Sequence, residues 1–141
     1  MNNQIERIDL KTEFLIGIEA VDRQHSFLID LYNDLADKLN QGKDQPEIEE
    51  VLEKLFDYTR YHFSTEEKIM EARRYPGLES HRRQHQTFIR TLSDFSSHHN
   101  LTGEGLAGVV NFLGQWVQGH ILITDKEMGE FLMPPARDTA A

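Results

Sequence analysis

Histidine and carboxylate residues at helical spacing are the part of this sequence best suited to chemistry. The chain has seven histidines. His62 and Glu66 are four residues apart, and so are His81 and His85. In an α-helix this spacing places both side chains on one face, a turn apart, where they can converge on a metal ion. One such pair is weak support for a metal site, because similar pairs also occur on solvated surfaces.

Four long amphipathic segments predict the helices that would carry these residues. Apolar residues recur at spacings of three and four over residues 20–40, 46–72, 78–98 and 104–132. The breaks between the segments are short, which implies that consecutive helices are antiparallel neighbours. The predicted fold is therefore all-α, an up-down-up-down antiparallel four-helix bundle. Five glycines in the fourth segment predict that its helix is less regular than the others.

The sequence outside these segments predicts a simple division of the chain. Residues 1–19 lack helical periodicity and would form an extended N-terminal arm over the bundle. The arm would pack through four apolar residues: Phe14, Leu15, Ile16 and Ile18. Residues 20–133 would form the bundle, and residues 134–141 a short tail.

Position along the bundle is the stronger argument for one shared site. The turns at the end of the bundle away from the site would lie near Lys43 and Leu101. Seven residues are 16 to 24 positions from those turns: His25, His62, Glu66, His81, His85, His120 and Asp125. With a rise of about 1.5 Å per residue, they fall in one layer roughly 12 Å thick. All four helices contribute to it, whereas random placement would scatter these residues along the bundle.

Five imidazoles in one layer predict metal binding. Each buried ring needs a partner, and burying several without one is unfavourable. Seven ligands are too many for one ion, so two ions are implied. A di-zinc site is an alternative, but zinc prefers four ligands and commonly takes cysteine, which this chain lacks. Imidazole together with bridging carboxylate suits iron.

The spacing within the fourth segment does not fit an ideal helix. His120 and Asp125 are five residues apart, which is about 140° around an α-helix. Either Asp125 leans inward or the helix is locally irregular, which Gly119 would permit.

Charge and composition exclude several classes of protein. The net charge of −9 argues against nucleic acid or an anionic membrane as the main partner. The absence of cysteine excludes disulfides, iron–sulfur clusters and thiol catalysis. Residues 1–11 contain no apolar run of signal-peptide length. No stretch is expected to reach the apolar length of a membrane span, and the predicted location is cytoplasmic.

These residues together resemble the hemerythrin family. The motifs are Asp22-Arg23-Gln24-His25, His62-x3-Glu66-Glu67, His81-x3-His85 and His120-x4-Asp125. The resemblance spans roughly residues 17–132 and is strongest for the single-domain prokaryotic members. Supporting positions are Gly17, Met70, Tyr75-Pro76 and Trp116.

The resemblance implies two non-haem iron ions that change between Fe2+ and Fe3+ and share an oxo or hydroxo bridge. One iron would be held by His81, His85 and His120, and the other by His25 and His62. Glu66 and Asp125 would bridge the two. O2 would bind at an open position of the second iron, in a pocket of apolar residues: Leu28, Phe63, Trp116, Val117 and Ile121.

A few positions depart from the family pattern or have a simpler explanation. Leu10 stands where many relatives have tryptophan, and Met128 where many have tyrosine, so no hydrogen-bonding or electron-transfer role is expected at Met128. Glu67 and the arginines of the Arg82-Arg83 pair are expected to be exposed charges near the metal end of the bundle.

The function predicted from the sequence is reversible O2 binding for storage, delivery or buffering, without enzyme activity. No inward serine, lysine or unassigned carboxylate stands ready for bond-making chemistry. One alternative is a di-iron enzyme acting on peroxide, nitric oxide or nitrite, although five neutral imidazoles weaken it, since anionic ligands are what stabilise high-valent iron. The other is an oxygen or iron sensor. Delivery would require an oxygen-consuming protein partner, and sensing a signalling partner.

Overall fold

The computed structural model describes residues 4–9, 11–98 and 103–132, and the side chains of these except 95–98 and 103–104. Its elements in chain order are η1 (Thr12–Phe14), α1 (Glu19–Asn40), α2 (Gln45–Ala72), α3 (Leu78–His98), α4 (Gly103–Gly119), η2 (His120–Asp125) and α5 (Lys126–Leu132). No strand occurs in these ranges. The predicted all-α class is confirmed, and the four long helices begin and end within one residue of the predicted positions.

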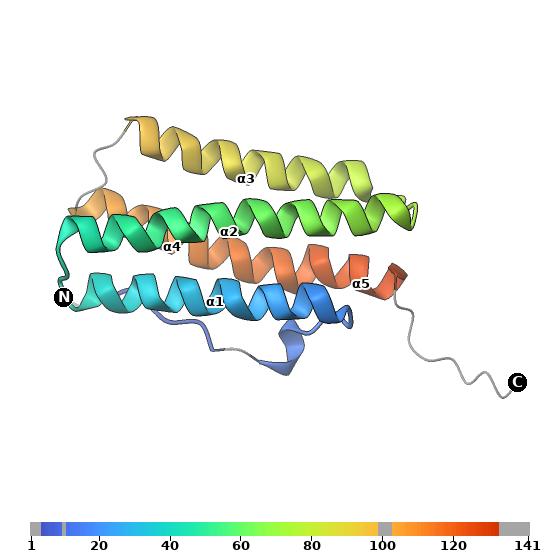
Figure 1. The fold of residues 1–141 in the computed structure, drawn as a ribbon, viewed down its shortest axis with the longest axis horizontal. Coiled ribbons are helices and arrows are strands. Elements are labelled where there is room, and N and C mark those ends of the chain that lie inside the picture. The colour runs from blue at the N-terminus through green and yellow to red at the C-terminus, as the bar shows by residue number, and fades with distance from the viewer. Residues whose placement is uncertain (1–3, 10, 99–102, 133–141) are drawn as a thin grey trace, which may run out of the picture.

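The helices form an antiparallel bundle with the N-terminal arm along one side. Figure 1 shows α1, α2, α3 and the α4–α5 unit running in alternating directions, which confirms the predicted up-down-up-down order. The arm runs back along α1 before the chain enters that helix.

Two asparagines of α1 hold the arm in an extended conformation. The Asn33 side chain accepts from Ile8 N (2.7 Å) and donates to Ile8 O (2.8 Å). Asn40 makes the same pair of bonds with Ile5, both at 2.8 Å. Each amide thus satisfies one donor and one acceptor of a segment that has no neighbouring strand.

The predicted packing points of the arm were partly wrong. Phe14 and Ile16 are buried and Ile18 is partly buried, but the side chain of Leu15 is 50% exposed. Ile5 and Ile8, which helical periodicity cannot identify, are each only 4% exposed. The division into arm, bundle and tail stays a prediction. Leu10 and residues 133–141 lie outside the described residues.

The junction between the arm and α1 depends on Asp22 and two glycines. The Asp22 carboxylate accepts hydrogen bonds from Ile16 N (2.8 Å) and Gly17 N (3.1 Å). Gly17 has φ +95°, a conformation that favours glycine. On α5, a Cβ at Gly129 would lie 2.4 Å from the carbonyl oxygen of Ile16, so only glycine lets the arm approach this closely.

The last helical unit is regular except at the site. The glycines of α4 do not disturb it, and Gly114 leaves room for Tyr32, whose hydroxyl would lie 2.5 Å from an added Cβ. The irregular part is η2, a π-helix over His120–Asp125. Its extra residue changes which side chains face inward. Asp125 is buried, whereas the preceding Thr124 is only partly buried.

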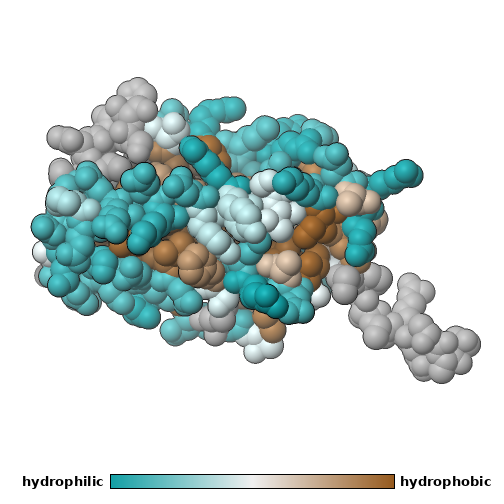
Figure 2. Space-filling view, in the orientation of Figure 1, coloured by the Kyte–Doolittle hydropathy of each residue, from teal (hydrophilic) through white to brown (hydrophobic). Residues whose placement is uncertain are grey.

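The buried residues form two apolar clusters separated by a polar layer. The main core contains 21 buried residues of the described chain, from Ile5 to Ile121. The smaller cluster has five: Ile16, Val21, Met70, Met128 and Leu132. Figure 2 shows that hydrophilic residues cover most of the visible face, with apolar surface showing between them.

One expectation about membranes was wrong. The helical stretch Gly105–Leu132 is long and apolar enough to cross a membrane by length and composition. In the bundle this stretch packs against α1 and carries the buried residues His120 and Asp125. Its buried apolar residues belong to the two apolar clusters of the bundle.

Candidate metal centre

All seven residues predicted from the sequence lie together in the layer between the two apolar clusters. Each is buried, with an exposed fraction between 0% and 6%. They come from every long helical unit of the bundle: His25 from α1, His62 and Glu66 from α2, His81 and His85 from α3, and His120 and Asp125 from η2. The structure thus brings together residues up to 100 positions apart in the chain.

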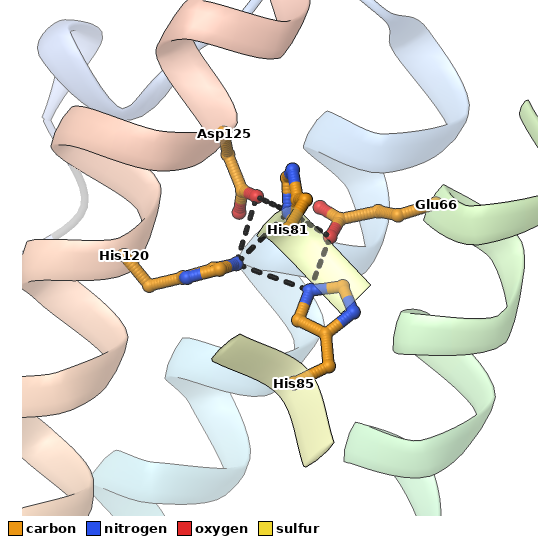
Figure 3. A group of neighbouring side chains, drawn as sticks. All are labelled: Glu66, His81, His85, His120 and Asp125. Atoms are coloured by element: carbon orange, nitrogen blue, oxygen red, sulfur yellow. Dashed lines mark hydrogen bonds and ion pairs between the residues drawn. The ribbon is translucent and has the colours of Figure 1, made fainter. Parts of the chain in front are cut away.

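The seven residues form two overlapping groups in which the ligand atoms lie within 4.8 Å of one another. The first group consists of Glu66, His81, His85, His120 and Asp125, and Figure 3 shows these side chains converging from three helices. The second group consists of His25, His62, Glu66 and Asp125. Both groups include the same two carboxylates, so the arrangement is suited to two cations that share ligands.

Each carboxylate turns one oxygen toward each group. Glu66 Oε1 lies 3.1 Å from His85 Nε2, whereas Glu66 Oε2 lies 3.0 Å from His62 Nε2. Asp125 Oδ1 lies 2.9 Å from His81 Nε2 and 3.0 Å from His120 Nε2. Its Oδ2 lies 2.9 Å from His25 Nε2. This is the orientation required of a carboxylate that bridges two metal ions.

The polar atoms at the centre lack the partners that burial normally demands. Glu66 Oε1 and both oxygens of Asp125 accept no hydrogen bond from the residues that the structure describes, although imidazole nitrogens surround them. The Nε2 atom of His120 lies 3.1 Å from that of His81 and 3.1 Å from that of His85. Nitrogen lone pairs this close repel unless a proton or a cation lies among them. The residues therefore fit bound metal ions.

The electrostatics of the layer also favour positive charge. Burial opposes a charge on His25, but the neighbouring Asp125 and Glu66 carboxylates outweigh it and raise its pKa to about 9. The same balance raises the pKa of His81 to about 9. Burial would raise the pKa of Glu66, yet the surrounding histidines hold it well below its usual value. Burial lowers the pKa of His120, so positive charge is favoured beside the carboxylates at His25 and His81, where a metal ion would take its place.

The π-helix explains how two residues five apart serve one site. In an α-helix, His120 and Asp125 would point about 140° apart. The π-helical turn has i→i+5 hydrogen bonds, so residues five apart lie nearly above each other. Of the two possibilities left open by the sequence, local irregularity of the helix is correct. The irregular segment begins directly after Gly119.

Two glutamines fix the orientation of two histidines, and the sequence analysis gave neither of them a role. Gln24 Nε2 donates to Thr65 Oγ1 (3.2 Å), which leaves Gln24 Oε1 to accept from His62 Nδ1 (2.7 Å). Gln84 Oε1 accepts from His120 Nδ1 (3.1 Å) and from Thr124 Oγ1 (2.9 Å). With Nδ1 carrying the proton, Nε2 presents its lone pair to the centre.

A repeated tripeptide was the signal that could have identified these glutamines. Arg-Gln-His occurs at residues 23–25 and again at residues 83–85. In each copy the histidine belongs to the layer, and the preceding glutamine accepts a hydrogen bond from a histidine of the next long helical unit, His62 of α2 and His120 of η2. The two halves of the bundle thus orient one histidine each through the same glutamine–histidine hydrogen bond.

The expectation that Glu67 is an exposed charge was wrong. Its side chain is 25% exposed, and Oε2 accepts a hydrogen bond from His85 Nδ1 at 2.8 Å. Its other oxygen lies 3.3 Å from Arg82 Nε. Arg82 itself is 29% exposed and also pairs with Glu79 at 2.8 Å, so it is not simply a solvated charge either.

The residues expected to line an oxygen pocket lie in or against the main core beside the layer. Leu28, Phe63, Val117 and Ile121 are buried, and Trp116 is partly buried. Phe63 stacks on His85 with 3.8 Å between ring centres, and Trp116 stacks on His120 at 4.3 Å. Met128 is fully buried in the smaller cluster on the other side. The role of these residues as a pocket stays a prediction.

Comparison with known proteins agrees with this geometry. Residues 16–132 match the family described as the hemerythrin HHE cation binding domain. The chain therefore belongs to the hemerythrin family. A bacteriohemerythrin of Pseudomonas aeruginosa is 36% identical over 108 residues, which cover 74% of this chain and 68% of the relative.

Further relatives cover more of their own length. A bacteriohemerythrin of Clostridium acetobutylicum is 26% identical over 122 residues, 83% of this chain and 95% of the relative. A myohemerythrin of Theromyzon tessulatum is 30% identical over 112 residues, 79% of this chain and 82% of the relative. Together these matches support a protein of bacteriohemerythrin type.

Proposed function

We propose that the chain binds O2 reversibly at two non-haem iron ions held by His25, His62, Glu66, His81, His85, His120 and Asp125. The observation that carries this proposal is the position of the two shared carboxylates, each with one oxygen toward each group. Five imidazole nitrogens and two carboxylates are a donor set that suits iron. The iron pair would supply the electrons that O2 takes up on binding and returns on release.

The surroundings of the layer support binding rather than bond-making chemistry. Among the described residues, Asn33 and Thr59 are the buried polar side chains outside the seven. Both are engaged with backbone atoms, Asn33 with Ile8 and Thr59 with the carbonyl oxygen of Leu55 at 2.7 Å. Neither has a hydrogen bond with the layer, so the described residues offer no spare buried acid or base for a reaction.

The apolar residues beside the layer would keep the bound oxygen from water. Leu28 lies one turn from His25 on α1, and Ile121 follows His120 directly. Phe63 and Trp116 cover the faces of His85 and His120. Exclusion of water limits the supply of protons and small anions that would displace the oxygen. Reversibility thus depends on these side chains, while the seven polar residues hold the metal.

The test is an absorption spectrum of the reduced, iron-loaded protein before air, after air and after deoxygenation. We expect two irons per chain by elemental analysis, visible bands on addition of O2, and their loss when O2 is removed. Irreversible conversion on first exposure, with stoichiometric hydrogen peroxide, would contradict reversible binding and favour an enzyme or a sensor. One iron per chain, or none after desalting, would contradict the proposed centre itself.

A further inference from the structure

The five histidines present the same atom to the centre but differ in what holds the opposite side of the ring. In every case Nε2 lies beside the shared carboxylates and Nδ1 points outward. His62 and His120 donate from Nδ1 to the neutral amide oxygens of Gln24 and Gln84. Nδ1 of His25 and of His81 has no hydrogen-bond partner within the described part of the chain. Among the described residues, His85 is the only one of the five whose Nδ1 donates to a carboxylate, that of Glu67.

Glu67 lies at the boundary between the centre and the surface. Its side chain belongs to the wall of a groove of about 620 Å³ between α2 and α3, which is also lined by Phe63, His85 and Arg82. Arg82 lies 3.3 Å from Glu67, 3.7 Å from Glu71 and 2.8 Å from Glu79. The charge of Glu67 is therefore shared between one imidazole on its inner side and one guanidinium on its outer side.

We propose that Glu67 is a positioning residue that sets the reduction potential of the iron held by His85, and that Arg82 moderates its effect. A carboxylate that accepts the Nδ1 proton increases electron donation from Nε2 to the metal. Stronger donation stabilises Fe3+ relative to Fe2+, so the potential falls. The glutamines orient their histidines in the same way but add no charge. The step affected is the gain of one electron by Fe3+ to give Fe2+, with the proton remaining between His85 and Glu67.

The consequence is a difference between the two groups of the centre. The group with His81, His85 and His120 receives the additional negative charge of Glu67, whereas the group with His25 and His62 has only the neutral Gln24. The first iron should therefore be the stronger electron donor of the pair. This inference rests on the proposed iron centre, but it does not require that oxygen binding be reversible.

The experiment measures the reduction potential of the full-length, iron-loaded protein by anaerobic spectroelectrochemical titration, with iron content determined for every variant. Glu67→Gln keeps the hydrogen-bond acceptor and removes the charge. We expect the potential to rise by an amount equivalent to roughly a tenfold change in the ratio of reduced to oxidised iron, or about 59 mV for one electron. Glu71→Gln is the control, because Glu71 lies one turn further along α2 and also pairs with Arg82.

Two reciprocal variants test the same inference from the opposite direction. Gln84→Glu would place a carboxylate beside Nδ1 of His120. Arg82→Gln would remove the guanidinium that partly neutralises Glu67, so His85 would experience more of its negative charge. Both should lower the potential. Arg83→Gln is the matched control for Arg82, because its guanidinium contacts the backbone oxygen of Glu79 and not Glu67. These variants keep the inference testable if Glu67→Gln fails to retain iron.

The outcomes separate this inference from the proposed function. An unchanged or lower potential in Glu67→Gln at full iron content, or equal shifts in Glu71→Gln, would overturn it. So would the absence of a downward shift in both Gln84→Glu and Arg82→Gln. If the wild-type protein binds no iron, the proposed function fails, and the Nδ1 proton resonance of His85 in the metal-free and zinc-loaded protein then tests whether Glu67 positions His85. That resonance should move in Glu67→Gln and not in Glu71→Gln; no movement would overturn the inference.

Discussion

The two apolar regions of the bundle differ in what holds them together. The main core has 21 buried residues of the described chain, contributed by the arm and all four helical units. The smaller cluster has five and lies beyond the polar layer, so it is cut off from the main core. Apolar burial alone can stabilise the first region. The second region depends on the layer, and therefore on whatever neutralises the two carboxylates and five imidazoles.

This comparison predicts that changes in the layer affect metal binding first, whereas changes in the main core affect stability first. The largest expected effect is that of Glu66→Ala. It removes one oxygen from each group and leaves two cations with less compensating charge. We expect the loss of at least one iron per chain by elemental analysis. Glu53→Ala, an exposed position on the same helix, is the control, and equal iron loss in both variants would refute the role of Glu66.

Removal of iron should destabilise the smaller cluster more than the main core. Binding to the native state alone stabilises it by about 4 kcal/mol when free metal is roughly a thousand times the dissociation constant. We expect a lower unfolding temperature after chelation. Hydrogen exchange should increase most near Val21, Met70 and Met128. A uniform increase that includes Leu35 and Leu113 in the main core would argue against the division into two regions.

Leu28→Ala and Leu52→Ala should separate protection of the site from packing. Both leucines are 4% exposed and belong to the main core, so each truncation should cost about 2–5 kcal/mol in unfolding free energy. Both variants should retain two irons. Only Leu28→Ala should accelerate decay of the oxygenated spectrum and azide binding to the oxidised protein. If Leu28→Ala leaves both rates unchanged, Leu28 does not guard the site.

The smallest effect is expected from Asn33→Ala in the arm. It leaves the backbone N–H and C=O of Ile8 without their partners, at a cost of about 1–3 kcal/mol. Denaturant unfolding should report this loss, and iron content should not change. Loss of iron in this variant would mean that the arm also stabilises the layer.

The convergence of the seven polar residues could be predicted because position along an antiparallel bundle follows from counting residues. Contacts around each helix could not be predicted in the same way. Gln24, Glu67 and Gln84 face a neighbouring helix, and their partners depend on helix rotation that the sequence pattern does not determine. The arm shows the same limit. Ile5 and Ile8 pack and Leu15 does not, because an extended segment without a paired strand has no fixed period.

The π-helical turn at His120–Asp125 matters for recognising such centres in other sequences. Ligands three or four residues apart share one face of an α-helix, and a search limited to those spacings would miss this pair. A histidine followed five residues later by a carboxylate, in a segment that is otherwise α-helical, should be read as a sign of one inserted residue. Alignment to a relative with an unbroken helix would then need a one-residue gap between positions 120 and 125. Without that gap, every position after Asp125, including Met128, would be compared with the wrong partner.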